Sequence, residues 1–393
     1  MTPKQFRIQT LNAIDAAGLS RFPDDRYEVG AGVQNPHALL LRSAKLHDTP
    51  IPESVLAVAR AGAGTNNIPV AALTERGVPV FNTPGANANA VKELVLCALL
   101  LTSRRIAPAM DWVKTLKGQG DQVEKLIEKG KSQFAGPEIQ GKALGVVGLG
   151  AIGILVANAA SQLGMEVYGY DPYLSVEHAW HLSSAVHRSL SLDEIYAKCD
   201  YITLHLPQTK DTKGMVNGDS IQKMKDGVRI LNFARGALVD SPALLEALEK
   251  GKVAAYATDF PTDSMLGTEG IVALPHLGAS TPESEDNCAV MAVDQIKDYL
   301  ENGNILNSVN LPSISMAREA GTKRICIIHK NVPNTIALFA STCGEAGINI
   351  ENMQSKSKGE YAYTILDVSG DLSPAAVDAL RALEPIVKVR VIQ

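Results

Sequence analysis

One segment constrains the fold of this chain more than any other: the run VVGLGAIG at 146–153, which an aspartate follows at 171. Its glycines, Gly148, Gly150 and Gly153, have the G-x-G-x-x-G spacing of a dinucleotide-binding turn. The first glycine permits a tight turn, the second lets the backbone approach a pyrophosphate, and the third lets the helix pack closely on the strand. The free N–H groups at the start of that helix then favour a bound anion.

The residues around this turn support the interpretation. Residues 142–148 predict a short apolar strand, 151–163 have helical spacing of apolar residues, and 165–170 predict the next strand. Asp171 follows the glycines at about 20 residues, where a carboxylate binds the ribose hydroxyls. No arginine follows closely, which favours NAD over NADP because Asp171 would repel a 2′-phosphate. The alternative is a tight turn in some other α/β protein. The cofactor-binding residues predicted here are Gly148, Gly150, Ala151, Ile152, Gly153 and Asp171.

Composition excludes several other classes of protein. A length of 393 residues predicts two or three domains, and a net charge of -5 gives no electrostatic reason to bind nucleic acid or an anionic membrane. No apolar run reaches the roughly 18 residues of a membrane span, and the N-terminus lacks the apolar core of a secretion signal. Five cysteines are scattered without C-x-x-C spacing. We therefore expect a cytoplasmic protein with reduced thiols and no metal site.

The order of predicted strands and helices gives the fold class. The first 85 residues and residues 141–281 both alternate short apolar strands with helices, which predicts parallel sheets with helical crossovers. Residues 302–315 are rich in Asn, Gly, Pro and Ser and resemble a linker. The last 70 residues have the order βαββαβ of the ferredoxin-like fold. The prediction is an α/β protein with two doubly wound, Rossmann or flavodoxin-like domains and a ferredoxin-like C-terminal domain.

Three polar residues follow strands of the nucleotide-binding region, where ligands of doubly wound sheets bind. Arg235 follows one strand and is able to hold a carboxylate through two hydrogen bonds; a surface arginine is the alternative. His276 ends another strand and suits acid–base chemistry near neutral pH, although a lone histidine is more often structural. Asp263 lies just past a third strand, and beside His276 it would orient the ring; a turn aspartate is the alternative.

Two arginines end strands of the first domain. These are Arg42, which precedes Ser43, and Arg60, which lies two residues before Gly62. Two such cations would suit a substrate with more than one negative charge. Ordinary loop arginines would also explain them. His205 and Pro207 end a further strand and are candidates to line the same crevice, unless they belong only to a turn.

Taken together, these segments resemble the D-isomer-specific 2-hydroxyacid dehydrogenases, and the resemblance covers nearly the whole chain. The matching segments are Leu41-Arg42-Ser43, Arg60-Ala61-Gly62-Ala63-Gly64, Asn82-Thr83-Pro84, GLGAIG at 148–153, Gly169-Tyr170-Asp171-Pro172, His205-Leu206-Pro207, Asn232-Phe233-Ala234-Arg235-Gly236 and Pro275-His276-Leu277-Gly278-Ala279-Ser280-Thr281. Their order and spacing agree with the family, which makes the match far more specific than any single motif.

The resemblance implies roles for these residues. Arg235, Asp263 and His276 would be catalytic, with Asp263 replacing the usual glutamate in a shorter turn. The substrate would contact Arg42, Ser43, Arg60 and Gly62 as well as Arg235 and His276. Further contacts to NAD would come from His205, Pro207, Ala234, Asp259 and Gly278.

The resemblance also implies a reaction. We expect NAD-linked oxidation of 3-phospho-D-glycerate to 3-phosphohydroxypyruvate, at the start of L-serine synthesis. Another D-2-hydroxyacid substrate, such as one related to glyoxylate, hydroxypyruvate or pyruvate, is the nearest alternative. A non-catalytic protein that senses NAD(H) is the alternative from another class.

The family pattern implies a division into domains. Residues 1–91 and 282–303 would form a substrate domain, 92–281 the NAD-binding domain, 304–322 a linker and 323–393 a regulatory domain that resembles an ACT domain. His329, Asn331 and Asn349 match its effector-binding positions, and L-serine is the expected effector. Asn334 stands where the family has glycine, and asparagine tolerates a left-handed backbone. A homodimer or homotetramer is expected, and the charged segment 118–135 has no assigned role.

Overall fold

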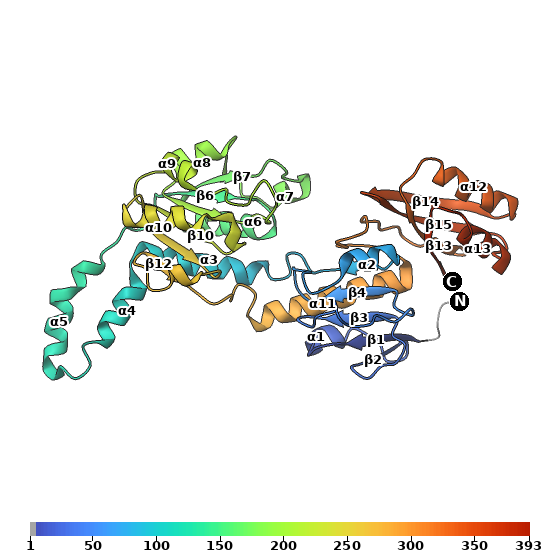
Figure 1. Ribbon diagram of the computed structural model, residues 1–393, viewed down its shortest axis with the longest axis horizontal. Coiled ribbons are helices and arrows are strands. Elements are labelled where there is room, and N and C mark those ends of the chain that lie inside the picture. Colours follow the sequence, from blue (N-terminus) through green and yellow to red (C-terminus); the bar gives the residue numbers. More distant parts are fainter. Residues whose placement is uncertain (1–4) are drawn as a thin grey trace. The chain divides into compact units, whose positions relative to one another are not determined.

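The structure, a computed structural model, describes residues 5–393 and divides into two compact units. Unit 1 contains the chain up to Asn87 together with Pro282–Gln393, and unit 2 contains Ala88–Thr281. Figure 1 shows one sheet with helices in unit 2 and two sheets with helices in unit 1. The α/β fold class predicted from the alternation of strands and helices is therefore confirmed. The chain passes between the two units at 87/88 and 281/282. The domain boundaries expected at 91/92 and 303/304 stay predictions.

The first sheet of unit 1 is parallel, with strand order β2-β1-β3-β4-β5. This order is that of a flavodoxin-like doubly wound sheet. Its strands are β1 (Phe6–Thr10), β2 (Tyr27–Gly30), β3 (Ala38–Leu41), β4 (Ala57–Arg60) and β5 (Val80–Phe81), and its helices are α1 (Ala16–Leu19), α2 (Val70–Glu75) and α11 (Pro282–Asn302).

Both faces of this sheet are covered, which explains why its strands are apolar at consecutive positions. Leu40 and its same-face neighbours pack against α11, where Val293 and Ile296 are fully buried. Leu39 and Leu41 point to the opposite face, into a cluster that contains Leu73 of α2. The helix that completes this first sheet therefore comes from a segment nearly 200 residues later in the chain.

The sheet of unit 2, every residue of which is described, has seven parallel strands in the order β12-β11-β10-β9-β6-β7-β8. Counted from its first strand the order is 3-2-1-4-5-6-7, which extends the Rossmann arrangement by one strand. The switch point, where ligands bind such sheets, lies between β6 and β9. The strands are β6 (Ala143–Val147), β7 (Glu166–Tyr170), β8 (His187–Arg188), β9 (Tyr201–Leu204), β10 (Val228–Asn232), β11 (Val253–Thr258) and β12 (Ile271–Ala273).

Helices cover both faces of the unit 2 sheet. One face packs on α3 and α6 through residues such as Leu99 and Ala157, and the other packs on α8, α9 and α10 through residues such as Ile195 and Leu244. The helices of unit 2 are α3 (Ala88–Ser103), α4 (Ile106–Lys114), α5 (Val123–Gly130), α6 (Ala151–Gln162), α7 (Val176–Trp180), α8 (Leu192–Lys198), α9 (Gly218–Lys223) and α10 (Ser241–Glu249), with short 3-10 turns η1 (Gly120–Gln122), η2 (Lys131–Phe134), η3 (Gly236–Leu238) and η4 (Asp263–Met265).

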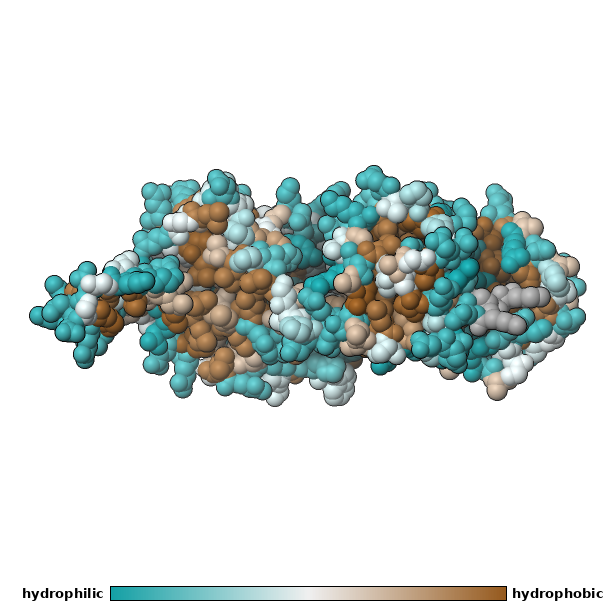
Figure 2. Space-filling model, turned by 90° about the horizontal axis from the view of Figure 1, so that it is seen from below, coloured by the Kyte–Doolittle hydropathy of each residue, from teal (hydrophilic) through white to brown (hydrophobic). Residues whose placement is uncertain are grey.

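Helices α4 and α5 form an arm on unit 2 that contributes no residue to its core. The rings of Trp112 and Phe134 hold the two halves of the arm together, with centroids 5.3 Å apart. Ile106, Met110 and Val113 repeat at helical spacing along α4 and are exposed. Figure 2 shows the arm as the narrow end at the left, mostly hydrophilic with hydrophobic side chains at its surface. The segment 118–135, unassigned from the sequence, lies in this arm.

The C-terminal residues of unit 1 form an antiparallel sheet of order β14-β15-β13-β16 with the βαββαβ chain order predicted from the sequence. Asn334 adopts the left-handed conformation at φ 67° at the start of α12, as expected for the residue that replaces glycine. The elements are β13 (Lys323–Lys330), α12 (Thr335–Glu345), β14 (Asn349–Lys358), β15 (Tyr361–Ser369), α13 (Pro374–Arg381) and β16 (Ile386–Ile392).

The central strands β13 and β15 of this C-terminal sheet are buried on both faces, whereas the edge strand β14 is mostly exposed. Ile325 and Ile327 of β13 pack beneath α12 and α13. The alternate residues Cys326 and Ile328 belong to the same core cluster as Tyr299 of α11, so the two sheets of unit 1 share a core. No pattern in the sequence indicates this second buried face.

One buried ion pair fastens the connection between these sheets. Arg324 and Asp367 are fully buried and joined by two hydrogen bonds of 2.7 Å. The remaining N–H groups of Arg324 donate to the carbonyls of Asn302, Met316 and Ala317, which come from the end of α11 and the segment after it. Every donor-bearing nitrogen of the guanidinium is thereby used, which makes its burial tolerable.

Candidate functional site

The three glycines of the nucleotide turn occupy positions with different steric demands. Gly148 has a φ of 95°, and a Cβ there would lie 2.5 Å from the carbonyl oxygen of His205. A Cβ on Gly153 would lie 1.9 Å from the carbonyl oxygen of Gly148. Both distances are well below contact distance, so any side chain at these positions would displace backbone. The turn therefore needs glycine at 148 and 153 for its own construction.

Gly150 is different, because no heavy atom lies within 4 Å of the place where its Cβ would be. It caps the N-terminus of α6, which begins at Ala151 and continues through Ile152. Within residues 5–393, no side chain caps the first N–H groups of this helix. The result is open space beside free N–H donors, which is the arrangement that accommodates a pyrophosphate.

Asp171 at the end of β7 braces the same turn. Its two carboxylate oxygens accept hydrogen bonds from the backbone N–H groups of Leu149, at 2.9 Å, and Tyr173, at 2.8 Å. A carboxylate has about four acceptor positions, so Asp171 retains capacity for two ribose hydroxyls. The acid thus fixes the glycine turn while remaining suited to bind the ribose.

His205 follows β9 on the other side of the switch point. Its Nε2 lies 2.9 Å from the hydroxyl oxygen of Thr203, and burial lowers the pKa of His205 to about 4. The ring is therefore neutral at pH 7. Pro207 is exposed, and its carbonyl accepts a hydrogen bond of 2.7 Å from the Thr212 hydroxyl.

The loop that carries Arg235 is held by a buried asparagine at the end of β10. Asn232 donates through Nδ2 to the Arg235 carbonyl, at 2.9 Å, and accepts at Oδ1 from the Ala234 N–H, at 3.2 Å. The Arg235 side chain is exposed, and its Nη1 donates to the Ala234 carbonyl. The guanidinium therefore keeps most of its donors for a ligand. The sequence analysis missed the positioning role of Asn232.

Asp259 at the end of β11 is the most unusual polar residue of unit 2. It is only 3% exposed, and no side chain among the described residues donates a hydrogen bond to either carboxylate oxygen. Burial raises its pKa, while the nearby charge of His276, the N–H of Gly278 and Arg235 act in the opposite direction. A buried carboxylate with no side-chain donor is costly, so this position suits a ligand that brings N–H groups.

His276 lies in the exposed loop after β12, against the ring of Phe260, with centroids 4.6 Å apart. Phe260 also touches the Arg235 loop, because a Cβ on Gly236 would lie 3.2 Å from its Cβ. The structure thus brings His276, Arg235 and Asp259 to one edge of the sheet. Asp263 begins η4 nearby in the chain, exposed, and no ion pair joins it to His276 among the described residues.

In unit 1, Asn12 shapes the loop that carries Arg42 and Ser43. Its Oδ1 accepts hydrogen bonds from the N–H groups of Arg42, Ser43 and Ala44. The Arg42 guanidinium is held by both carboxylate oxygens of Glu285 on α11, at 2.7 and 2.8 Å. The expected anion-binding arginine therefore already has an anionic partner, which the sequence analysis did not anticipate.

Arg60 lies at the end of β4 beside the glycine loop that follows it. Its Nε donates to the Arg42 carbonyl, at 2.8 Å. Gly62 has a φ of 155°, and a Cβ on Gly64 would lie 2.7 Å from Nη1 of Arg60. The glycines thus let the backbone fold closely over the guanidinium.

The three residues expected to bind an effector lie in different environments. His329 is buried, with Nε2 at 2.9 Å from the Thr364 hydroxyl and Nδ1 at 2.8 Å from the Lys330 carbonyl. Asn331 and Asn349 are exposed, and each already donates one side-chain hydrogen bond, to Gly359 and Glu351 respectively. His329 consequently braces the loop whose surface Asn331 presents.

Comparison with known proteins identifies the family. Residues 96–278 match the sequence model described as D-isomer specific 2-hydroxyacid dehydrogenase, NAD binding domain. The D-3-phosphoglycerate dehydrogenase of Haemophilus influenzae is 30% identical over 404 residues, which cover 99% of this chain and 95% of that protein. The chain belongs to the D-isomer-specific 2-hydroxyacid dehydrogenase family. It is thus an NAD-binding oxidoreductase whose full-length relatives are named D-3-phosphoglycerate dehydrogenase.

Solved structures of this dehydrogenase family have the same fold. The NAD+-bound 3-phosphoglycerate dehydrogenase of Entamoeba histolytica has a TM-score of 0.59 and 26% identity, and the match covers 78% of this chain and 99% of that one. A glyoxylate reductase from Paecilomyes thermophila has a TM-score of 0.64 and 25% identity over similar shares, 78% and 99%.

The residues of this 2-hydroxyacid dehydrogenase fit NAD. The open space at Gly150 and the free N–H groups of α6 would receive the pyrophosphate, and Asp171 the ribose. The buried Asp259 carboxylate, which has no side-chain donor among the described residues, would accept an N–H donor such as the carboxamide of the nicotinamide. When bound, NAD supplies the hydride acceptor for oxidation of an alcohol.

Two further findings concern metals and membranes. No group of three or more His, Cys, Asp or Glu side chains in residues 5–393 is placed to hold a metal ion. None of the helices in that range has the length and apolar character needed to cross a bilayer.

Proposed function

We propose that this dehydrogenase oxidises 3-phospho-D-glycerate to 3-phosphohydroxypyruvate with NAD, the first step of the phosphorylated route to L-serine. The observation that carries this proposal is the length of the match to the Haemophilus influenzae enzyme, which extends over 99% of the chain and so includes the C-terminal sheet. We assign the enzyme to the cytoplasm because its five cysteines are free thiols, which suits a reducing compartment.

In this proposal the residues of unit 2 carry the proton transfer. His276 accepts the proton of the C2 hydroxyl, and its exposed ring is free to meet a substrate. Arg235 binds the C1 carboxylate and orients the C2 oxygen, using the guanidinium donors that Ala234 leaves unused. Asp263 orients the imidazole, directly or through a water molecule. The proximity of Asp259 to His276 and Arg235 supports one chemical centre at this edge.

The residues of unit 1 are assigned to the anionic groups of the substrate. Arg60 and Arg42 bind the phosphate and carboxylate, with Ser43 and Gly62 offering backbone or hydroxyl donors beside them. The Arg42–Glu285 pair is exposed on both sides, at 43% and 40%, so its net strength is small. A phosphate dianion offers Arg42 a stronger bidentate partner than this carboxylate.

The substrate is tested by initial rates of NADH oxidation with 3-phosphohydroxypyruvate, pyruvate and glyoxylate. A strong preference for the phosphorylated keto acid would support the proposal. Preference for an unphosphorylated keto acid would be consistent with the proposed dehydrogenase chemistry but would contradict the proposed substrate. Absence of turnover with all three would instead support a protein that senses NAD(H) without catalysis.

The proton-transfer role predicts the behaviour of one variant. His276→Ala should lower kcat by roughly 10²–10⁴ because general acid–base catalysis is removed, while NADH binding stays nearly intact. Phe260, which contacts the ring, provides a control, since Phe260→Leu keeps the histidine and should cost much less. Steady-state kinetics and NADH fluorescence titration measure both effects. Unchanged turnover of His276→Ala would remove this residue from the mechanism.

We further propose that L-serine regulates the enzyme through the C-terminal sheet, at the loop of His329 and Asn331 together with Asn349. The exposed amides of Asn331 and Asn349 support this assignment, since they are accessible to a small polar ligand. Repeating the rate assay with L-serine and with D-serine tests it. An effect of L-serine alone, lost in Asn349→Ala, is the expected result; equal effects of both enantiomers would contradict a specific site.

We also propose that the enzyme is a homodimer or homotetramer in which the arm of α4 and α5 contacts another copy. The exposed apolar row of Ile106, Met110 and Val113 supports this, because an isolated arm gains little from exposing it. Sedimentation equilibrium of the wild type and of Met110→Asp tests the proposal. A monomeric wild type, or an unchanged mass for Met110→Asp, would contradict it.

A further inference from the structure

The first sheet of unit 1 has a switch point of its own. Its strand order, β2-β1-β3-β4-β5, places β2 on one side of β1 and all later strands on the other, so the switch point lies between β1 and β3. Doubly wound sheets of this order bind ligands there, outside the carboxyl ends of the strands. Asn12 follows β1, and the loop of Arg42, Ser43 and Ala44 follows β3. The two segments therefore meet where this sheet is expected to hold a ligand.

The side-chain oxygen of Asn12 accepts three successive N–H groups of that loop. They belong to Arg42, Ser43 and Ala44, and their nitrogens lie 3.2, 3.0 and 2.8 Å from Oδ1. Successive backbone N–H groups that converge in this way suit an anionic oxygen. They also fix the orientation of the amide, because a reversed amide would direct its own N–H groups at three donors. Nδ2 of Asn12 therefore points away from the loop N–H groups.

This Nδ2 is an accessible donor. Asn12 is half-buried, and its Nδ2 retains contact with solvent and makes no hydrogen bond within residues 5–393. The exposed Ser43 hydroxyl likewise makes none there. Acceptors of the same loop are already used, since Arg60 and Asn67 donate to two of its carbonyls, at 2.8 and 2.7 Å. The switch point thus has donors in excess, which suits a ligand with several anionic oxygens.

The charges beside the switch point are compatible with an anionic ligand. Arg42 and Arg60 end the two strands next along the sheet from β1. Glu285 pairs with Arg42, but both side chains are more than a third exposed, so the pair is weak. Asp15, the acid nearest to Asn12 in the sequence, is engaged as the cap of α1. A phosphate would therefore meet two guanidinium groups and two neutral donors.

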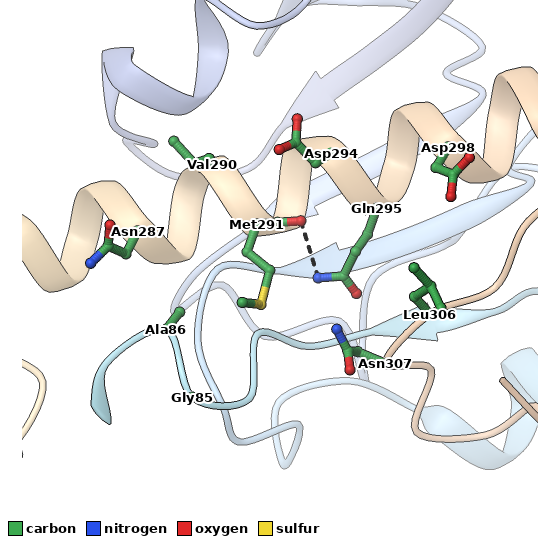
Figure 3. Close-up of a pocket in the computed structure, with 10 residues that line it drawn as sticks. All are labelled: Gly85, Ala86, Asn287, Val290, Met291, Asp294, Gln295, Asp298, Leu306 and Asn307. Carbon is green, nitrogen blue, oxygen red and sulfur yellow. Dashed lines mark hydrogen bonds between the residues drawn. The ribbon is translucent and has the colours of Figure 1, made fainter. Parts of the chain in front are cut away.

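Another hollow of unit 1 has the opposite character. It has a volume of about 590 Å³ and lies beside α11, between the turn at Gly85 and the segment of Leu306 (Figure 3). Its lining includes Asp294 and Asp298 and, in the described part of the chain, no Lys, Arg or His. An anion would be repelled there, so of these two places the switch point is the one that suits a phosphate.

The brace alone does not explain an amide at position 12. A carboxylate would accept the three loop N–H groups at least as well, because charge-assisted hydrogen bonds are stronger. The amide differs in having a donor to offer. We propose that Asn12 Nδ2 donates to the phosphate of the substrate, beside Arg42 and Arg60, and thereby helps the enzyme to select a phosphorylated 2-hydroxyacid. This inference rests on the substrate proposed above.

Asn12→Asp tests the inference, since this variant keeps the acceptor and removes the donor. KM and kcat are measured with 3-phosphohydroxypyruvate and with hydroxypyruvate, which lacks only the phosphoryl group. The KM for the phosphorylated acid should rise about tenfold or more, because a charge-assisted hydrogen bond is replaced by repulsion. Its kcat, and kcat/KM for hydroxypyruvate, should change by less than about twofold, because the contact is to a group that does not react.

Three controls separate the donor from charge and from folding. Gln9→Glu makes the same change of amide to carboxylate on β1, where the Gln9 amide donates to the Ala31 carbonyl, and should keep both wild-type KM values. Asn12→Ser removes the amide without adding charge and should still raise the KM for the phosphorylated acid more than that for hydroxypyruvate. Urea unfolding of Asn12→Asp should keep the wild-type midpoint, because the loop N–H groups retain their acceptor.

The outcomes distinguish this inference from the proposal on which it rests. A wild type without preference for the phosphorylated acid would overturn both. A wild type with that preference, together with a wild-type KM in Asn12→Asp, would show that Asn12 only braces the loop and would overturn this inference alone. Equal losses with the two acids would also overturn it.

Discussion

Glu285 is the ion-pair partner of Arg42, the residue that we propose to bind the substrate phosphate. Glu285 holds both terminal nitrogens of Arg42, yet both side chains are more than a third exposed, so water screens the pair and its net worth is at most about 1 kcal/mol. In the proposed reaction a phosphate competes with Glu285 for the same guanidinium. Under this proposal, the Glu285 carboxylate should lower the affinity of the site for phosphorylated substrate.

Glu285→Gln should therefore lower the KM for 3-phosphohydroxypyruvate by about fivefold, the equivalent of about 1 kcal/mol, and leave the KM for glyoxylate nearly unchanged. Steady-state kinetics at low ionic strength measures both constants. Glu283→Gln is a matched control, since Glu283 is exposed in the first turn of the same helix. An equal fall for glyoxylate, or in the control, would separate Arg42 from phosphate binding.

The lowered pKa of His205 predicts how the free energy of unfolding depends on pH. Its folded pKa of about 4 lies below the ordinary value of 6.5, so between these values the unfolded chain binds more protons than the folded one. The stability that the neutral ring contributes is complete above pH 6.5 and is lost as the pH falls toward 4. His205→Gln should flatten the fall in unfolding free energy between pH 6.5 and 4.5, measured by urea denaturation. The exposed His181→Gln should retain the wild-type slope.

At the scale of elements, the glycines of the turn before α6 have different roles. Gly148 and Gly153 are needed for folding, and Gly150 is the one that we expect to be needed for NAD binding. Gly153→Ala forces a Cβ into the Gly148 carbonyl and should destabilise the protein by about 1–3 kcal/mol. Gly150→Ala meets no protein atom and should fold normally, but its methyl group intrudes on the space for the pyrophosphate. Urea unfolding and NADH fluorescence titration distinguish the two effects. The assignment would be contradicted if Gly150→Ala bound NADH like the wild type.

The same elements show what could be predicted from the sequence. The glycine turn, Asp171 and the βαββαβ order depend on local spacing, which sequence patterns carry directly, and the structure has all three. The left-handed Asn334 was predictable because few residues tolerate that conformation. Local rules are enough wherever a feature lies within one strand–turn–helix segment.

Other features depend on residues far apart in the chain. Arg42 and Glu285 are separated by 243 positions, and no local pattern indicates that two exposed charges will pair. Asn232 and Asn12 brace loops through side-chain hydrogen bonds that sequence spacing does not encode. Asp263 and His276 follow different strands, so whether they interact depends on loop conformation, and their pairing stays a prediction.

On the scale of the whole molecule, unit 1 joins two sheets through one core. The face of the C-terminal sheet that carries Cys326 and Tyr363 is buried with Tyr299 of α11, and Arg324 ties the connecting segment to Asp367. An effector bound to the C-terminal sheet would therefore act on a hydrophobic core that the first sheet of unit 1 shares. The proposed regulation would then pass through packed side chains and not through a flexible linker between the two sheets.

The buried ion pair predicts a large effect on stability. Arg324→Met leaves Asp367 buried without its cation, together with three unpaired carbonyls, and should lower the free energy of unfolding by about 3–5 kcal/mol. The double variant Arg324→Met with Asp367→Leu should recover part of this loss because the uncompensated charge is gone. Urea denaturation measures both. A double variant less stable than the single one would show that Asp367 has another essential partner.

The late arrival of α11 has a consequence for synthesis on the ribosome. The first sheet exposes the apolar face of Ile8, Leu40 and Ala59 until the chain has been made through Asn302, because α11 covers that face. Roughly 200 residues separate the two segments, which at ~5–20 residues per second is roughly 10–40 s of translation. Unit 2, continuous in the chain, is complete before then. We therefore expect the middle of the chain to complete its fold before the N-terminal sheet does, and the nascent N-terminal sheet to need protection of its apolar face in the meantime.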